Sequence, residues 1–174
     1  DDAARGNDKS VTSLNRYGRT QGAASRHGWE TGGTDDKYQI LYRDLKKKDS
    51  KLVELISNFE AEYSFIDNDG PLLYFKSDRE APRGKLIAID LQKKNPSDPA
   101  GWRTVIPQSD DKLAAVSRVN ERFIADYLKD AHTQVKIFDK GGKLQHEVKL
   151  PGLGTATGFS GRREHKETFY LYTS

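Results

Sequence analysis

Ser160 is the residue whose surroundings come nearest to those of a catalytic nucleophile. It lies in the segment Gly158-Phe159-Ser160-Gly161-Arg162. The nucleophile elbow of an α/β-hydrolase has the pattern Gly-x-Ser-x-Gly on a turn from a strand into a helix, with an acidic residue and a histidine later in the chain. Here arginine replaces the last glycine, and the flanking residues predict strands on both sides. We therefore interpret Ser160 as a turn residue and expect no catalytic residue in this chain.

The histidines and acidic pairs do not indicate a metal centre or an acid–base site. The four histidines are His27, His132, His146 and His165. His146 falls in a strand of alternating pattern, on the face that we assign to solvent, and the other three fall in polar segments, none at metal-ligand spacing from another. Asp110 and Asp111 lie in a predicted loop with no apolar pocket around them. We therefore expect neither a metal nor another cofactor.

The composition excludes several classes of protein. The 29 basic and 26 acidic residues give a net charge of +3, and this near balance argues against a nucleic-acid binder, which concentrates basic residues on one face. No apolar run approaches the roughly 18 residues of a membrane span. The chain has no cysteine, which excludes disulfides and fits a reducing compartment. We therefore expect no nucleic-acid or membrane partner and a cytoplasmic location, with the periplasm left open.

The apolar residues divide the chain into two parts. Residues 1–36 are rich in Asp, Arg, Gly, Ser, Thr and Asn, and their large apolar residues follow no period; these are Val11, Leu14, Tyr17 and Trp29. Such a segment cannot bury enough apolar surface to offset the entropy of ordering it. We therefore predict a polar segment, irregular or disordered, over residues 1–36, and a β-rich domain over residues 37–174.

Short apolar runs between turn residues predict strands throughout the second part. The predicted strands are residues 38–45, 51–56, 63–68, 72–75, 85–91, 102–107, 114–119, 122–128, 134–139, 143–150, 155–160 and 168–173. Asn68-Asp69-Gly70 and Gly141-Gly142 are typical of hairpin turns, because they tolerate positive φ. Residues 46–59 also fit a helix, but we favour a strand there because the repeat described next has one at this place. The predicted fold class is all-β.

Three predicted strands end in an aspartate, at Asp44, Asp90 and Asp139, which are 46 and 49 positions apart. A period of about 40–50 residues with four short strands in each unit is the spacing of a β-propeller blade. We assign complete blades to residues 63–107 and 114–150, with the outer strand pair of a blade before them and the inner pair of another after them. The alternative is a two-sheet sandwich with coincidental spacing.

Two full blades and two half blades do not close a ring, because a propeller needs roughly four to eight blades. The terminal strands would leave open edges that invite pairing with other polypeptide. The sequence also lacks methionine, at position 1 and elsewhere. We therefore expect a partial β-propeller that belongs to a larger protein, either as a processed product or as a trimmed or internal piece. We also expect the isolated chain to be marginally stable or self-associating.

An ordered set of motifs between residues 32 and 174 resembles the β-propeller domain of the prolyl oligopeptidase family. The motifs are Gly33-Thr34-Asp35 with Tyr42-Arg43-Asp44-Leu45, Ile56-Ser57-Asn58-Phe59-Glu60-Ala61-Glu62-Tyr63, Asn68-Asp69-Gly70, Leu73-Tyr74-Phe75-Lys76-Ser77-Asp78-Arg79, Ala81-Pro82-Arg83-Gly84-Lys85-Leu86, Trp102-Arg103-Thr104-Val105-Ile106-Pro107, Gly158-Phe159-Ser160-Gly161 and Phe169-Tyr170-Leu171-Tyr172-Thr173-Ser174. The tryptophan motif matches the family's Trp-x-x-Val-Ile/Leu-Pro strand. Before Gly32 the family has another pair of apolar strands, whereas this sequence is polar there.

The resemblance implies a fold and a function. The family has a seven-bladed propeller that caps an α/β-hydrolase domain, and that domain cleaves short peptides after proline. The propeller has no catalytic residues; it limits access to small, unfolded peptides and keeps out bulk water. The implied partners are the α/β-hydrolase domain of the same parent protein and short proline-containing peptides. The resemblance also places Thr34 near the substrate cleft, and a small turn residue after two glycines is the other reading of that position.

The alternative function is that of a free-standing interaction module. A free-standing β protein could bind a peptide or another chain through its open strand edges. The resemblance favours the substrate-gating part of a serine endopeptidase, and cooperative unfolding of a monomeric chain that binds peptides would favour the interaction module.

Overall fold

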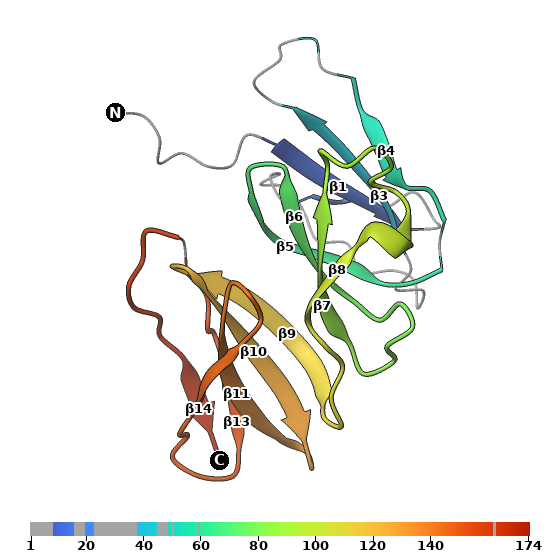
Figure 1. Cartoon of the computed structure of the whole chain (residues 1–174). Helices are drawn as coiled ribbons and strands as arrows, with labels where there is room; N and C mark the ends of the chain where they lie inside the picture. The colour runs from blue at the N-terminus through green and yellow to red at the C-terminus, as the bar shows by residue number, and fades with distance from the viewer. Residues whose placement is uncertain are drawn as a thin grey trace. The chain divides into compact units, whose positions relative to one another are not determined.

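The computed structural model describes residues 9–15, 20–22, 38–44, 49, 51–58, 60–161 and 163–174. These residues form strands and a short 3-10 helix, η1, at Pro99–Gly101 (Figure 1). Asp98 caps η1, because its Oδ1 accepts a hydrogen bond from the backbone N–H of Ala100 at 3.0 Å. In the described part of the chain, no helix is long and apolar enough to cross a membrane. The predicted all-β class is confirmed.

The described strands form four sheets. The first has the order β2-β1-β3-β4, with β1 at Lys9–Asn15, β2 at Thr20–Gly22, β3 at Tyr38–Asp44 and β4 at Val53–Ile56. The second has the order β5-β6-β7-β8, with β5 at Tyr63–Asp69, β6 at Leu72–Ser77, β7 at Lys85–Asp90 and β8 at Arg103–Ile106. The third has the order β12-β11-β10-β9, with β9 at Lys112–Val119, β10 at Arg122–Lys129, β11 at His132–Asp139 and β12 at Leu144–Val148. The fourth pairs β13 at Thr155–Thr157 with β14 at Leu171–Thr173.

The second and third sheets are the two complete blades predicted from the repeat. Each strand predicted after residue 37 corresponds to one observed strand, from β3 to β14, and β4 confirms a strand where a helix was the alternative. The last two strands are shorter than predicted, with three residues each. The neighbouring strands of the third sheet are antiparallel and follow one another along the chain. The fourth sheet has the two strands that were predicted for the last half blade.

The first sheet corrects the prediction for residues 1–36. We predicted irregular structure there and only two strands in the front blade, but β1 and β2 lie in this segment. β1 pairs with β3 from Lys9↔Asp44 to Asn15↔Tyr38, and β2 pairs with the other edge of β1. The prediction counted large apolar residues, whereas strand formation depends strongly on the neighbouring strand and is compatible with the β-branched Val11 and Thr12. The domain boundary at residue 36 stays a prediction.

The chain divides into two compact units, Asp1–Arg79 with Ala88–Arg103, and Glu80–Ile87 with Thr104–Ser174. In the first unit, β1 and β3 contact β5. The buried ring of Tyr63 packs edge-on against Trp102, with 5.9 Å between the ring centroids. The indole Nε1–H of Trp102 donates to the carbonyl of Pro96 at 2.8 Å. These contacts give the first unit an apolar core of its own.

The second unit is built around the third sheet, whose strand β10 carries buried side chains on both faces. Along β10, alternate side chains point to opposite faces. Phe123, Ala125 and Tyr127 are buried on one face, and Ile124 is buried on the other. An antiparallel sheet with one solvated face would show buried and exposed residues in alternation. The pattern of β10 is therefore that of a strand covered on both faces.

The β10–β11 hairpin contains a turn with positive φ at both central residues, Asp130 (46°) and Ala131 (64°). Aspartate tolerates this conformation, whereas an alanine Cβ costs about 1–2 kcal/mol there. We expect Ala131→Gly to raise the free energy of unfolding by about 1 kcal/mol, measured by urea denaturation. Ala115→Gly on β9 is the control, and it should lower the same quantity. An Ala131→Gly variant that is less stable than the parent chain would contradict the prediction.

Candidate functional site

The loop around Ser160 is a turn between strands, as predicted. It follows β13, and the exposed Ser160 has a backbone N–H that donates to the carbonyl of Gly158 at 2.6 Å. The Ser160 carbonyl accepts a hydrogen bond from the hydroxyl of Thr168 at 2.8 Å. The next described strand is β14, so the segment is not a turn from a strand into a helix. The arrangement does not provide a nucleophile elbow.

The other residues singled out from the sequence are not brought together. His146 and His165 are exposed, as predicted for His146, and a ring nitrogen of His132 lies 3.4 Å from the carbonyl of Asp130. His27 and Thr34 lie outside the described residues. Among the residues that the structure describes, no group of three or more histidine, cysteine or acidic side chains could hold a metal ion.

The most elaborate contact of the second unit joins the third sheet to the fourth. The backbone N–H of Thr133 donates to the carbonyl of Gly154 at 2.9 Å, and its Oγ1 accepts from the N–H of Ala156 at 3.1 Å. On the other side of β10, the hydroxyl of Ser117 donates to the carbonyl of Phe159. These hydrogen bonds connect β9 and β11 to the segment that contains β13. We call this region the sheet junction.

Apolar side chains fill the sheet junction. Its buried members come from β9, β10, β11, β13 and the loop after β13, and they are Val119, Ile124, Val135, Ala156 and Phe159. The partly buried Ile137, Val148, Leu150 and Tyr172 pack against them. Phe159 also stacks on Tyr170, with 4.7 Å between the centroids and 15° between the planes. The junction is therefore held mainly by apolar burial, with hydrogen bonds that fix its register.

Two glycines allow the backbone to approach closely at the sheet junction. A Cβ on Gly154 would lie 2.2 Å from the carbonyl oxygen of Thr173, and a Cβ on Gly161 would lie 3.0 Å from Cγ2 of Val119. Contacts below about 3.0 Å are not tolerated, because packed interiors have no room for an added methyl group. Glycine at position 154 is therefore a requirement of the contact between the loop and β14.

Asp126 is a partly buried acidic residue at the margin of the sheet junction. It lies on the same face of β10 as Ile124, and its neighbours in register are Val135 on β11, which is fully buried, and Ala115 on β9, which is exposed. Its Oδ1 is enclosed and has no hydrogen-bond partner among the described residues. Burial raises the pKa of Asp126 to about 6, because removal from water disfavours the charged carboxylate.

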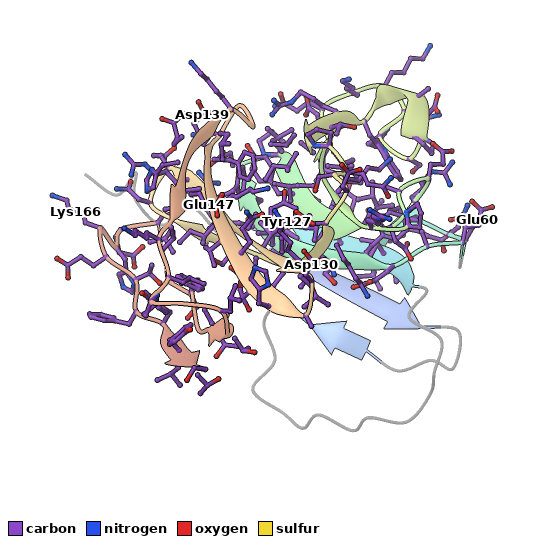
Figure 2. All side chains as sticks on the ribbon, turned by 90° about the horizontal axis from the view of Figure 1, so that it is seen from below. Glu60, Tyr127, Asp130, Asp139, Glu147 and Lys166 are labelled. Carbon is purple, nitrogen blue, oxygen red and sulfur yellow. The ribbon has the colours of Figure 1, made fainter. Side chains whose placement is uncertain are left out.

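The opposite face of the third sheet carries cations over aromatic rings. The Lys136 ammonium lies 4.7 Å from the ring centroid of Tyr127, and the Arg118 guanidinium lies 5.9 Å from that of Phe123. Burial, together with the negative charge of Asp111, raises the pKa of Tyr127 to about 12. Figure 2 shows Tyr127 among closely packed side chains. A neutral, packed phenol under a lysine stabilises the sheet and is not suited to proton transfer.

The repeated aspartates that marked the blade period organise turns. Oδ1 of Asp90 accepts a hydrogen bond from the N–H of Gln92 at 2.9 Å. Oδ1 of Asp139 accepts from the N–H groups of Gly141 and Lys143, both at 2.9 Å. The N–H two residues further on is the common partner, which is the pattern of an Asx turn. The side chain of Asp44, the first aspartate of the series, lies outside what the structure describes.

We expect Asp139→Ala to lower the free energy of unfolding by about 2 kcal/mol, because it removes a charged acceptor from two backbone N–H groups at a partly exposed site. Asp139→Asn keeps an acceptor oxygen and should lose about half as much. Urea denaturation of the three proteins measures the effect. Equal stability of the alanine variant and the parent chain would show that the turn forms without the carboxylate.

Residues 30–174 match the family of prolyl oligopeptidase N-terminal β-propeller domains. The chain belongs to this family. A prolyl endopeptidase from Elizabethkingia miricola is 37% identical over 139 residues, which cover 78% of this chain and 19% of that protein. The dual function macrocyclase-peptidase POPB from Galerina marginata is 30% identical over 158 residues, which cover 80% of this chain and 21% of that protein. The chain therefore spans about a fifth of the length of these curated relatives.

Solved structures of the prolyl oligopeptidase family share the fold of this propeller chain. One, from a structural and mechanistic analysis of two prolyl endopeptidases, aligns with a TM-score of 0.75 and 29% identity, over 96% of this chain and 24% of that chain. Prolyl oligopeptidase B from Galerina marginata, bound to a 35mer hydrolysis and macrocyclization substrate, aligns with a TM-score of 0.71 and 28% identity, over 79% of this chain and 19% of that chain. The predicted partial propeller is confirmed, and the two-sheet sandwich is wrong.

Three residues of the sheet junction in this propeller chain were not identified from the sequence. Asp126 did give a signal, because it is a single carboxylate inside the apolar run of residues 122–128. Ser117 and Thr133 gave none, since a hydroxyl side chain in a strand has the same pattern on a solvated face and at a contact between sheets. Their role follows only from the placement of β13 against β11, for Thr133, and of the loop after β13 against β9, for Ser117.

Proposed function

We propose that this chain is the non-catalytic, substrate-gating part of a prolyl oligopeptidase-type serine endopeptidase that cleaves short peptides after proline. The match of residues 30–174 to the propeller domain of that family carries the proposal. The α/β-hydrolase domain of the same parent protein is the proposed partner. No Gly-x-Ser-x-Gly segment is present in the 174 residues, which supports a role in access to a catalytic site that lies in the partner domain.

The packing of the third sheet supports a role as a barrier that limits access to an active site. The burial of β10 on both faces and the apolar side chains of the sheet junction pack the third and fourth sheets together in the second unit. A rigid wall next to an active site limits entry to chains that are small or unfolded, and it reduces the access of bulk water. Short proline-containing peptides are the substrates that this proposal implies. Thr34 remains a proposed cleft residue.

One observation favours the second candidate function, a free-standing interaction module. The fourth sheet has two strands, and three large apolar side chains on it or next to it are mostly exposed, namely Leu153 (78%), Phe169 (81%) and Leu171 (76%). An open sheet edge beside apolar side chains can bind an extended peptide by adding a strand. In the gating proposal, further strands of the same blade cover this surface.

The intact mass of the protein in its native source tests the gating proposal first. A mass well above 19.6 kDa, found with an antibody against this chain, is the expected result. The purified protein should then cleave a short reporter peptide after its single proline and should leave a folded protein with exposed prolines intact. The 174-residue chain alone should cleave neither. A native mass of 19.6 kDa, with peptide binding and no cleavage, would replace the proposal with the interaction module.

A further inference from the structure

Asp126 is an ionisable residue at the margin of the sheet junction, and its Oδ1 is enclosed without a hydrogen-bond partner among the described residues. Asp126 stands on β10 between the two places where hydrogen bonds tie the sheets together. Ser117 pairs with Ile124 on one side of it, and Thr133 pairs with Leu128 on the other. We propose that Asp126 makes the attachment of the fourth sheet to the third sheet depend on pH, with the tighter attachment in acid.

The contacts of Asp126 explain why its charge opposes attachment. The fully buried Val135 lies next to it in register, and Val135 belongs to the apolar cluster that includes Ala156 of β13. The carboxylate oxygen Oδ1 is enclosed without a hydrogen-bond partner among the described residues. A buried, unpaired charge is costly, whereas the protonated carboxyl group costs much less. We infer that the fourth sheet shields this oxygen, because two residues on the same face, one on either side of it, meet β13. Ile124 shares the apolar cluster with Ala156, and Thr133 accepts a hydrogen bond from the N–H of Ala156.

The groups around Asp126 do not offset its charge. On the same face, β11 provides Thr133, Val135 and Ile137, and β9 provides Ala115 next to Asp126. The charged or titratable side chains on this face of the sheet are exposed or partly exposed and lie further along it, namely Lys112 opposite Leu128, His146 opposite Ile137, and Arg122 and Asp139 opposite each other. The elements packed against this face contribute Ala156 and Tyr172, of which only the tyrosine is ionisable. Burial is the single cause of the raised pKa of Asp126. The charged form is therefore disfavoured by lost hydration and is not compensated by an ion pair.

The direction of the pH effect follows from the raised pKa. The attached state holds the Asp126 proton up to a pH of about 6, whereas a hydrated aspartate releases it near 3.8. The stabilisation is therefore complete below about pH 3.8, declines as the pH rises toward about 6, and is absent above it. If the chain is the gate of a peptidase, which is the function proposed above, this segment of the gate is looser at neutral pH than in mild acid.

Hydrogen exchange of two amides measures the attachment directly. The N–H groups of Thr133 and Ala156 donate hydrogen bonds within the junction. In the intact protein that carries this chain, Asp126→Asn should slow their exchange about tenfold at pH 7.5 and change it little at pH 4.5. The full pKa shift of Asp126 would slow exchange by more than tenfold. We expect a smaller slowing because Asp126 lies at the margin of the junction, where solvent screens its charge. Exchange rates are compared between variant and parent at each pH, which removes the intrinsic dependence on pH.

Two further variants separate the charge from other effects. Glu147→Gln on β12 neutralises a carboxylate of the same sheet and keeps the oxygen that accepts a 2.9 Å hydrogen bond from Gln134. It should leave both amides unchanged. If Asp126→Asn does not fold, Asp126→Ala is measured in its place, with the same expectation. Equal effects of the Asp126 variants at both pH values, or no effect at pH 7.5, would overturn the proposal. The readout does not use peptidase activity, so a failure of the proposed function would not affect it.

Discussion

Replacement of Gly142 by alanine should destabilise the chain by about 3–5 kcal/mol. A Cβ at this position would lie 1.7 Å from the carbonyl oxygen of Val105 on β8, and the backbone φ of 88° is one that alanine rarely adopts. The steric overlap involves backbone on both sides, so neither partner can move as a side chain would. The two costs, displacement of packed backbone and a positive φ, therefore act together.

Gly141 provides a matched control one residue away in the same turn. A Cβ there would contact only the Oδ1 atom of Asp139 at 3.2 Å, and its φ is not in the positive range. Gly141→Ala should therefore cost less than about 1 kcal/mol. The thermal midpoint and the yield of folded protein measure both variants. Similar losses for the two alanines would show that the approach to Val105 is not a constraint on the fold.

Replacement of Phe159 by alanine should detach the fourth sheet. Phe159 is buried in the sheet junction, stacks on Tyr170, and has a carbonyl that accepts the hydrogen bond from Ser117. Truncation of a buried phenylalanine costs about 3–5 kcal/mol. This loss should raise the hydrogen-exchange rate of the Ala156 amide by at least about a hundredfold, since each 1.4 kcal/mol is a factor of ten when exchange requires opening.

Phe169 is the matched control for Phe159, because it is a nearby aromatic residue that is 81% exposed. Phe169→Ala should change the exchange of the Ala156 amide by less than about threefold, in keeping with the small effects of exposed substitutions. The contrast is informative because both variants remove the same group of atoms. If Phe169→Ala releases the fourth sheet as strongly as Phe159→Ala, the junction extends further over β14 than its buried side chains indicate.

The strands after residue 37 could be predicted because their signals are local. Apolar runs, the turn at Gly141-Gly142 and the aspartates at the strand ends each depend on a few neighbouring residues. The structure also explains why an aspartate recurs once in each complete blade. Asp90 and Asp139 each accept a hydrogen bond from a backbone N–H two residues later, so an acidic residue recurs where a turn must begin. The resemblance to the prolyl oligopeptidase propeller rested on the order of the same segments.

The features that could not be predicted depend on partners distant in sequence. β1 has too few large apolar residues to indicate a strand, and its partner β3 begins only at Tyr38. The sequence indicated a turn at Gly142 but not the approach of that turn to Val105. The role proposed for Asp126 depends on the docking of β13, which no local pattern describes. The candidate cleft residue Thr34 stays a prediction.

The connections between strands set the order in which the sheets can form. In the third sheet, β9, β10 and β11 follow one another through two-residue turns, with the pairs Val119↔Arg122 and Lys129↔His132 next to them. In the first sheet, β1 pairs with β3 only after a connection of residues 16–37 has been closed. Contacts between residues close in sequence form faster than contacts that close a long loop. When the complete chain refolds, the backbone amides of the third sheet should therefore become protected from hydrogen exchange before β1 joins the first sheet.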